Sequence, residues 1–130
     1  MSSILIIEDN ADNMALTVLL LQSAGYTVLS AKDAEVGLTI AQSERPDLIL
    51  MDIHLPGMDG LEATAVLKRD EATRAIPVIA LTALAMKGDE ERIRAAGCDG
   101  YIAKPIHIHE FLATIRAQLS ARTPAATTKI

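Results

Sequence analysis

Three short runs of the sequence are almost entirely apolar, and they constrain the fold more than any other feature. These runs cover residues 4–7, 47–51 and 77–81. A strand with one side facing solvent would alternate apolar and polar residues, whereas a continuous apolar run of this length is typical of a strand covered on both faces. Two weaker runs, 26–29 and 101–103, are further candidate strands. The sequence therefore predicts five strands, three of them in the interior of a sheet.

Segments with the periodicity of an amphipathic helix separate these runs. In residues 11–24, Met14, Val18 and Leu21 share one stripe, and the segment has Asn10 as its expected N-cap and Gly25 as its stop. Five alternating strand–helix units predict an α/β domain with a parallel sheet over residues 1–120, followed by a disordered tail over 121–130. The other predicted helices cover residues 34–43, 60–69 and 85–96, and a last segment that groups Phe111, Leu112, Ile115 and Leu119.

Composition excludes several classes of function. The formal net charge is −5, the twelve Lys and Arg residues are scattered, and only three residues are aromatic, so direct nucleic-acid binding is not expected. No apolar stretch approaches the roughly 20 residues that span a bilayer, and the N-terminus lacks the pattern of a signal peptide. The lone Cys98 has no partner for an internal disulfide. We expect a cytoplasmic protein that binds no membrane.

The strongest functional signal lies at the ends of the predicted strands. Glu8 and Asp9 follow the first strand, Asp52 the third, Thr82 the fourth and Lys104 the fifth. Each residue alone has an ordinary explanation, such as capping the next helix or lying in solvent. In an open parallel sheet, however, the carboxyl ends of the strands form one edge, where ligands bind. We therefore expect these five side chains to form a single site.

Three carboxylates at one edge need a compensating cation. Their mutual repulsion disfavours the fold and raises at least one pKa. Oxygen ligands in this number suit Mg²⁺, which also coordinates phosphate oxygens. A carboxylate beside a divalent cation and an ammonium group is a good phosphoryl acceptor, with Asp52 as the nucleophile, Lys104 offsetting charge on the phosphoryl oxygens and Thr82 bonding one of them after transfer.

Four motifs in this order resemble those of response-regulator receiver domains of the CheY-like superfamily. The likeness runs from about Ser3 to Leu119, and residues 85–92 make the chain most similar to single-domain DivK-type regulators and to receivers of hybrid histidine kinases. The resemblance implies a flavodoxin-like, doubly wound (βα)5 fold with strand order 2-1-3-4-5. The four motifs are residues 6–10, 48–60, 80–83 and 101–105.

The resemblance also implies a role for each matching residue. Asp52 would accept the phosphoryl group, and Lys104 would contact that group. Thr82 and Tyr101 would form the switch, and the Lys104–Pro105 peptide bond would be cis. The metal, Mg²⁺ or Mn²⁺, would be held by Asp9, Asp52 and the backbone carbonyl of His54, with Glu8 binding through a water or from behind these ligands.

The implied function is a phosphorylation-activated regulator in a two-component system or phosphorelay, and not an enzyme. Its partners would be a histidine kinase or histidine phosphotransferase, and a downstream target that the sequence does not name. One alternative is a receiver excised from a hybrid histidine kinase. A weaker one is a phosphohydrolase that forms an aspartyl-phosphate, but such enzymes carry a second Asp where His54 stands. A flavin-binding protein would need a phosphate loop in place of Glu8, Asp9 and Asn10.

Two features allow more than one interpretation. His54 suggests a general base, but a role in tuning the lifetime of the phosphoryl group is favoured. The first predicted helix has more apolar residues than one buried stripe needs, Leu16 and Leu19 among them. These residues either broaden its core-facing surface or form a docking patch for phosphohistidine-bearing helices. His107 and His109 are spaced poorly for a shared metal and are expected to face solvent.

Overall fold

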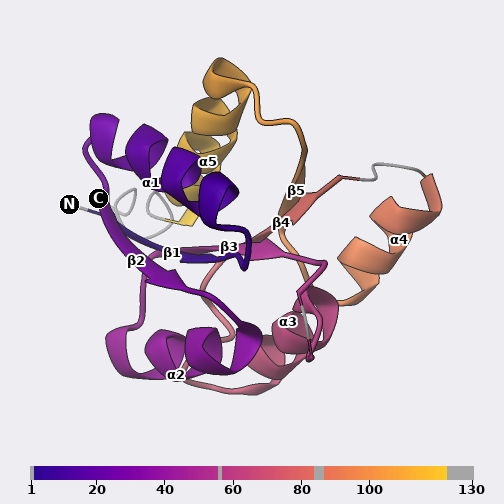
Figure 1. Cartoon of the computed structure of the whole chain (residues 1–130). Coiled ribbons are helices and arrows are strands. Elements are labelled where there is room, and N and C mark those ends of the chain that lie inside the picture. Colours follow the sequence, from indigo (N-terminus) through magenta and orange to yellow (C-terminus); the bar gives the residue numbers. More distant parts are fainter. Residues whose placement is uncertain (1, 56, 84–86, 123–130) are drawn as a thin grey trace.

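The computed structural model describes residues 2–55, 57–83 and 87–122. Five parallel strands form one sheet in the order β2-β1-β3-β4-β5 (Figure 1). This arrangement confirms the predicted parallel α/β fold and its strand order. The strands are β1 (Ser3–Ile7), β2 (Thr27–Ala31), β3 (Leu48–Asp52), β4 (Val78–Thr82) and β5 (Gly100–Ala103).

Helices cover both faces of the sheet, with α1 and α5 on one face and α2, α3 and α4 on the other (Figure 1). Helix α5 continues two residues past the predicted boundary at 120, and the rest of the predicted tail, 123–130, lies outside the described residues. The predicted start of the fourth helix at residue 85 also lies outside them. The helices are α1 (Ala11–Ser23), α2 (Ala34–Glu44), α3 (Gly60–Arg69), α4 (Lys87–Ala95) and α5 (Ile108–Arg122).

Alternate residues of the central strands supply two cores. In β1, Ile4 and Ile6 pack towards α1 and α5, and Leu5 and Ile7 pack towards α2 and α3. All four side chains are fully buried, which explains why the run lacks polar residues. Phe111 of α5 is the largest buried side chain of the core between the sheet and helices α1 and α5. The central strands are thereby fixed from both sides, which makes their carboxyl ends a rigid platform.

Helix α1 begins and ends where its sequence predicts. The side chain of Asn10 accepts a hydrogen bond of 2.9 Å from the backbone N–H of Asn13, and Gly25 adopts a φ of +94° just after the helix. Leu21 is buried, whereas the side chains of Leu16 and Leu19 are 44% and 61% exposed. A broad core-facing surface therefore does not account for these two leucines.

Strand β2 differs from its prediction by running to Ala31, two residues beyond Leu29. It stays paired with β1 as far as Ile7, and the backbone N–H of Glu8 donates to the carbonyl of Ala31 at 3.0 Å. Backbone pairing therefore extends the strand past the polar Ser30, where the apolar run of the sequence is interrupted, to the buried Ala31. None of the helices in the described part of the chain has the length and apolar character needed to cross a bilayer.

Candidate functional site

The carboxyl edge of the sheet brings together all the residues that the strand ends predicted. Glu8 and Asp9 follow β1, Asp52 ends β3, Thr82 ends β4 and Lys104 follows β5. Glu8, Asp9 and Asp52 each place one carboxylate oxygen within 4.8 Å of the other two. Glu8 and Asp52 are buried, whereas Asp9 is exposed. Two carboxylates thus sit at the base of the site and one at its rim.

Lys104 links the two buried carboxylates. Its ammonium nitrogen lies 3.1 Å from Oε1 of Glu8 and 3.3 Å from Oδ2 of Asp52. The backbone N–H of Lys104 donates to the carbonyl of Thr82 at 2.7 Å, which ties this segment to the end of β4. The Lys104–Pro105 bond is cis, as the resemblance implied. The lysine therefore reaches the carboxylates from a backbone held against the neighbouring strand.

The loop after β3 orients the carboxylate of Asp52. The backbone N–H of His54 donates to Oδ1 of Asp52 at 2.9 Å, while Oδ2 faces Lys104. Both oxygens of Asp52 therefore have a partner on the protein. The His54 side chain is exposed, so it can meet a group arriving from solvent.

The proximity of the buried carboxylates shifts their pKa values in opposite directions. Burial and the neighbouring Asp52 raise the pKa of Glu8 to about 7, despite the opposing effect of Lys104. For Asp52, burial acts to raise the pKa, but hydrogen bonds from Glu8, His54 and Lys104 outweigh it and lower the pKa. Burial likewise opposes the charge of Lys104, but the two carboxylates raise its pKa. With a pKa of about 7, Glu8 is protonated in part of the molecules at neutral pH, and a bound cation would favour its charged form.

The two residues predicted to form the switch lie at the end of β4 and within β5. Thr82 is fully buried, and Tyr101 is partly exposed on β5 beside α4. A hydrogen bond to the carboxylate of Glu90 in α4 raises the pKa of Tyr101. His107 and His109 are exposed, as expected. Tyr101 therefore connects the strand that leads to Lys104 with helix α4.

A hollow of about 460 Å³ lies beside the site and is lined in part by Asp9 and His54. Arg92 of α4 also lines this hollow; it lies within the segment 85–92 noted above, but no role at the site was predicted for it. Gly60, the first residue of α3, was missed as well: its backbone lies directly against Asp52 and Ile53. Glycine is common at the start of a helix, so the position of Gly60 in the sequence does not by itself indicate a contact with Asp52.

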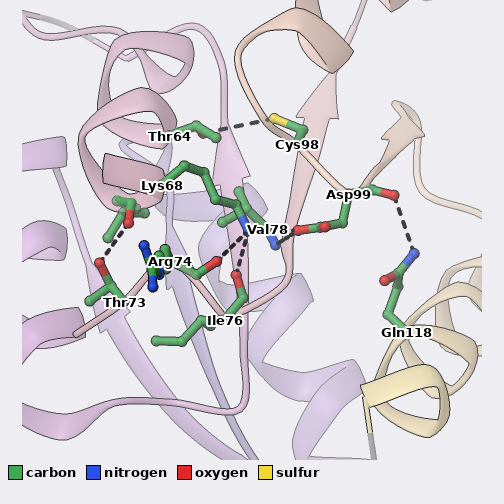
Figure 2. Close-up of polar contacts among 10 residues, drawn as sticks. Thr64, Lys68, Thr73, Arg74, Ile76, Val78, Cys98, Asp99 and Gln118 are labelled. Carbon is green, nitrogen blue, oxygen red and sulfur yellow. Dashed lines mark hydrogen bonds and ion pairs between the residues drawn. The ribbon is translucent and has the colours of Figure 1, made fainter. Parts of the chain in front are cut away.

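A second polar network, centred on Lys68 and Asp99, lies at the opposite edge of the sheet (Figure 2). The ammonium of Lys68 donates to Oδ2 of Asp99 at 2.9 Å and to the carbonyls of Arg74 and Ile76. Asp99 also accepts from the backbone N–H of Val78 at the start of β4. These contacts join the C-terminal end of α3 to β4 and β5, and they contribute no residue to the carboxylate site.

A doubly wound sheet in this order, with carboxylates and one lysine converging at its carboxyl edge, defines a receiver-type signalling domain. The sequence profile of the response regulator receiver domain matches residues 4–116, and the chain belongs to this family. Members of this family are phosphorylation-activated regulators of two-component systems and not classical enzymes. They take phosphoryl groups from histidine kinases or phosphotransfer proteins.

Similar proteins agree with this assignment. The polar-differentiation response regulator DivK of Brucella anthropi is 51% identical over 117 residues, which cover 90% of this chain and 95% of DivK. The receiver domain of the sensor histidine kinase PA1611 from Pseudomonas aeruginosa is 37% identical, with a TM-score of 0.86 over 92% of this chain and 98% of that domain. Its structure holds a magnesium ion in the active-site cleft.

The chemotaxis protein CheY4 of Vibrio cholerae is also similar, with 27% identity and a TM-score of 0.86 over 90% of this chain and 98% of CheY4. These matches do not favour the excised hybrid-kinase receiver, the phosphohydrolase or the flavin protein considered above. The similarity covers nearly the whole of each relative and includes the strand ends that carry the site.

Proposed function

We propose that Asp52 is the phosphoryl acceptor of this regulator and that the donor is a phosphohistidine on a histidine kinase or phosphotransferase. The position of Asp52 carries the proposal: it ends a central strand, beside two carboxylates and one ammonium group. A carboxylate oxygen of Asp52 would form a bond to phosphorus as the bond from phosphorus to the donor's imidazole nitrogen breaks. The released imidazole would then take a proton from solvent.

The donor set fits Mg²⁺ or Mn²⁺. Three carboxylate oxygens lie within 4.8 Å of one another, and oxygen donors are the ligands that these hard cations prefer. The ion would be held by Asp9, Asp52 and the backbone carbonyl of His54. Glu8 would bind a water on the metal, or would contact these ligands without touching the ion. Such a cation supplies positive charge to the phosphoryl oxygens. The raised pKa of Glu8 supports this proposal, because it reflects the crowding of buried carboxylates that a bound cation would relieve.

Lys104, Thr82 and Tyr101 would convert phosphorylation into a change of surface. The ammonium of Lys104 is already aimed at Asp52 and would turn to the phosphoryl oxygens. The hydroxyl of Thr82 would bond a phosphoryl oxygen, and Tyr101 would respond through its contact with Glu90 on α4. The target protein would then recognise the altered surface of α4, β5 and α5. We propose a cytoplasmic location, where kinase domains present phosphohistidine.

Intact-mass spectrometry tests the acceptor directly. The protein is incubated with acetyl phosphate and Mg²⁺, with the Asp52→Asn variant as control and EDTA as the metal-free condition. We expect one phosphoryl group on the wild type only, and only when Mg²⁺ is present. Equal uptake by Asp52→Asn would refute the assignment of Asp52.

A beryllofluoride titration covers the case in which the phosphoryl group is lost too quickly to be seen. This mimic should shift the amide resonances of Thr82 and Tyr101 in the wild type and leave those of Asp52→Asn unchanged. Absence of both an adduct and a beryllofluoride response would overturn the proposed function and leave the chain as a receiver that only binds partners.

A further inference from the structure

Gly60 is packed against the backbone that carries the acceptor. It is buried at the start of α3, and a Cβ atom at this position would lie 2.7 Å from Cα of Ile53 and 2.9 Å from the carbonyl carbon of Asp52. It would also overlap the carbonyl oxygen of Asp52. These neighbours are backbone atoms, which cannot rotate away as the end of a side chain can. Only glycine therefore allows α3 to approach the end of β3 this closely.

The close approach fixes the loop that orients Asp52. The backbone N–H of Gly60 donates to the carbonyl of Ile53 at 3.3 Å, which closes the loop between β3 and α3. The next residue in this loop, His54, donates its N–H to Oδ1 of Asp52. A shift of Ile53 would move this N–H and the His54 carbonyl together. The orientation of the Asp52 carboxylate therefore depends on where α3 packs against the end of β3.

The first turn of α3 is closed by its own side chains, and the helix also contacts the thiol of Cys98. The buried hydroxyl of Thr64 donates to the carbonyl of Gly60 at 2.8 Å, and Thr64 in turn lies 3.8 Å from the thiol of Cys98 (Figure 2). Asp59 and Glu62 form a reciprocal capping box around the first turn. The buried apolar side chains of α3 belong to the core on this face of the sheet, so the helix cannot easily retreat to make room for a larger residue at position 60.

We propose that Gly60 is a positioning residue for phosphotransfer: the absent side chain seats α3 on Asp52 and Ile53 and thereby sets the direction of the acceptor carboxylate. The inference rests on the proposed role of Asp52. It makes a prediction opposite to helix propensity, because alanine in place of glycine ordinarily favours a helix. At position 60, the same change should instead impair the site.

The test compares Gly60→Ala with Gly37→Ala in the full chain. Gly37 is also buried in a helix, and its added Cβ would lie 2.7 Å from Cγ1 of Ile7, a side-chain atom of the core that can adjust. Both variants insert one methyl group into a tight space, but only Gly60→Ala displaces the acceptor backbone. Melting curves show which fraction of each variant is folded, and rates are measured on folded protein at saturating Mg²⁺.

We expect Gly60→Ala to accept phosphate from acetyl phosphate at least about fivefold more slowly than Gly37→Ala, because displacing a reacting group by about 1 Å can cost a hundredfold in rate. The amide resonance of His54 should shift in Gly60→Ala only. A rate difference below fivefold would overturn the inference. If the wild type itself shows no Asp52-dependent uptake, the proposed function fails instead, so the two failures are distinguishable.

A second matched pair decides the question if Gly60→Ala does not fold. Thr64 and Thr73, both drawn in Figure 2, are buried. Each donates its hydroxyl to a backbone carbonyl at 2.8 Å, Thr64 to that of Gly60 and Thr73 to that of Leu67. Thr64→Val should slow phosphorylation at least twofold relative to Thr73→Val, because only Thr64 holds the residue that contacts Asp52. Equal rates for this pair would overturn the inference.

Discussion

The ammonium nitrogen of Lys104 lies 3.3 Å from Oδ2 of Asp52, although the two residues are 52 positions apart in the chain. The same nitrogen contacts Glu8, so one cation neutralises part of the charge of two buried carboxylates. Burial and the neighbouring Asp52 raise the pKa of Glu8 to about 7, so a proton can relieve part of the remaining negative charge. Protons, Lys104 and a divalent cation therefore compete for the same carboxylates, and the first three predictions depend on this competition.

In the metal-free protein, stability should fall as pH rises through neutrality. The pKa of Glu8 is about 7 in the folded chain against its usual 4.5, so between these values the folded state keeps a proton that the unfolded state has lost. The free energy of unfolding should therefore decrease by about 2–3 kcal/mol from pH 4.5 to pH 8. The lowered pKa of Asp52 acts below this window. Urea denaturation in EDTA at several pH values measures the free energy of unfolding. In Glu8→Gln this free energy should vary much less with pH. An unchanged pH dependence in that variant would contradict the role of Glu8.

Mg²⁺ should stabilise the folded chain, and more strongly at pH 8 than at pH 6. At ten times its dissociation constant, a ligand that binds only the folded state adds about 1.4 kcal/mol. Because the proton on Glu8 must leave or be displaced, the affinity for Mg²⁺ should increase with pH across the pKa of Glu8. Thermal denaturation at increasing Mg²⁺ concentration measures this. In Asp9→Asn and Asp52→Asn, Mg²⁺ should no longer raise the melting temperature. A wild-type melting temperature that does not change at saturating Mg²⁺ would argue against a metal site.

Replacing Lys104 by Ala should destabilise the metal-free protein at pH 8 by about 3 kcal/mol, because it leaves Glu8 and Asp52 buried without their cation. Much of this loss should return on adding Mg²⁺ or on lowering the pH to 6, since either a cation or a proton can replace the ammonium. Chemical denaturation under the three conditions provides the measurement. A loss that neither condition restores would show that Lys104 acts mainly through packing.

Exposed leucines on α1 should matter for docking but not for folding. Leu19 is 61% exposed, so Leu19→Ser should change stability by no more than about 0.5 kcal/mol. If α1 docks on the phosphohistidine-bearing helix of a donor protein, transfer from that protein should slow at least tenfold while transfer from acetyl phosphate stays unchanged. Val36→Ser is the matched control, because Val36 is 47% exposed on α2, on the other face of the sheet. Equal slowing in both variants would argue against docking on α1.

The Lys68 network should support stability without affecting the site. Lys68→Met removes a donor to Asp99 and to two backbone carbonyls, which should cost about 1–3 kcal/mol of unfolding free energy (Figure 2). Because these contacts lie at the opposite edge of the sheet, the additional stability conferred by Mg²⁺ should equal that of the wild type. Parallel denaturation curves with and without Mg²⁺ test both points; a reduced response to Mg²⁺ would show that the two edges are coupled.

Much of the fold and site was predictable because local patterns report burial. The uninterrupted apolar run of Ile4 to Ile7 indicated a strand covered on both faces, and Asn10 and Gly25 marked the ends of α1 through their local hydrogen bonding and backbone freedom. The placement of Asp52 and Lys104 at strand ends followed from the same alternation. In a parallel sheet, such ends must share one edge, so convergence could be inferred before any distance was known.

The sequence by itself thus determined the order of elements, the covered strands and the residues gathered at one edge, because hydrophobic periodicity and turn residues act over a few positions. Only the tertiary structure decided the extension of β2 to Ala31, the exposure of Leu16 and Leu19, the raised pKa of Glu8 and the close contact of Gly60 with Asp52. Each of these depends on atoms that are distant in the chain. Burial, charge coupling and steric fit arise only when those atoms are brought within a few ångströms.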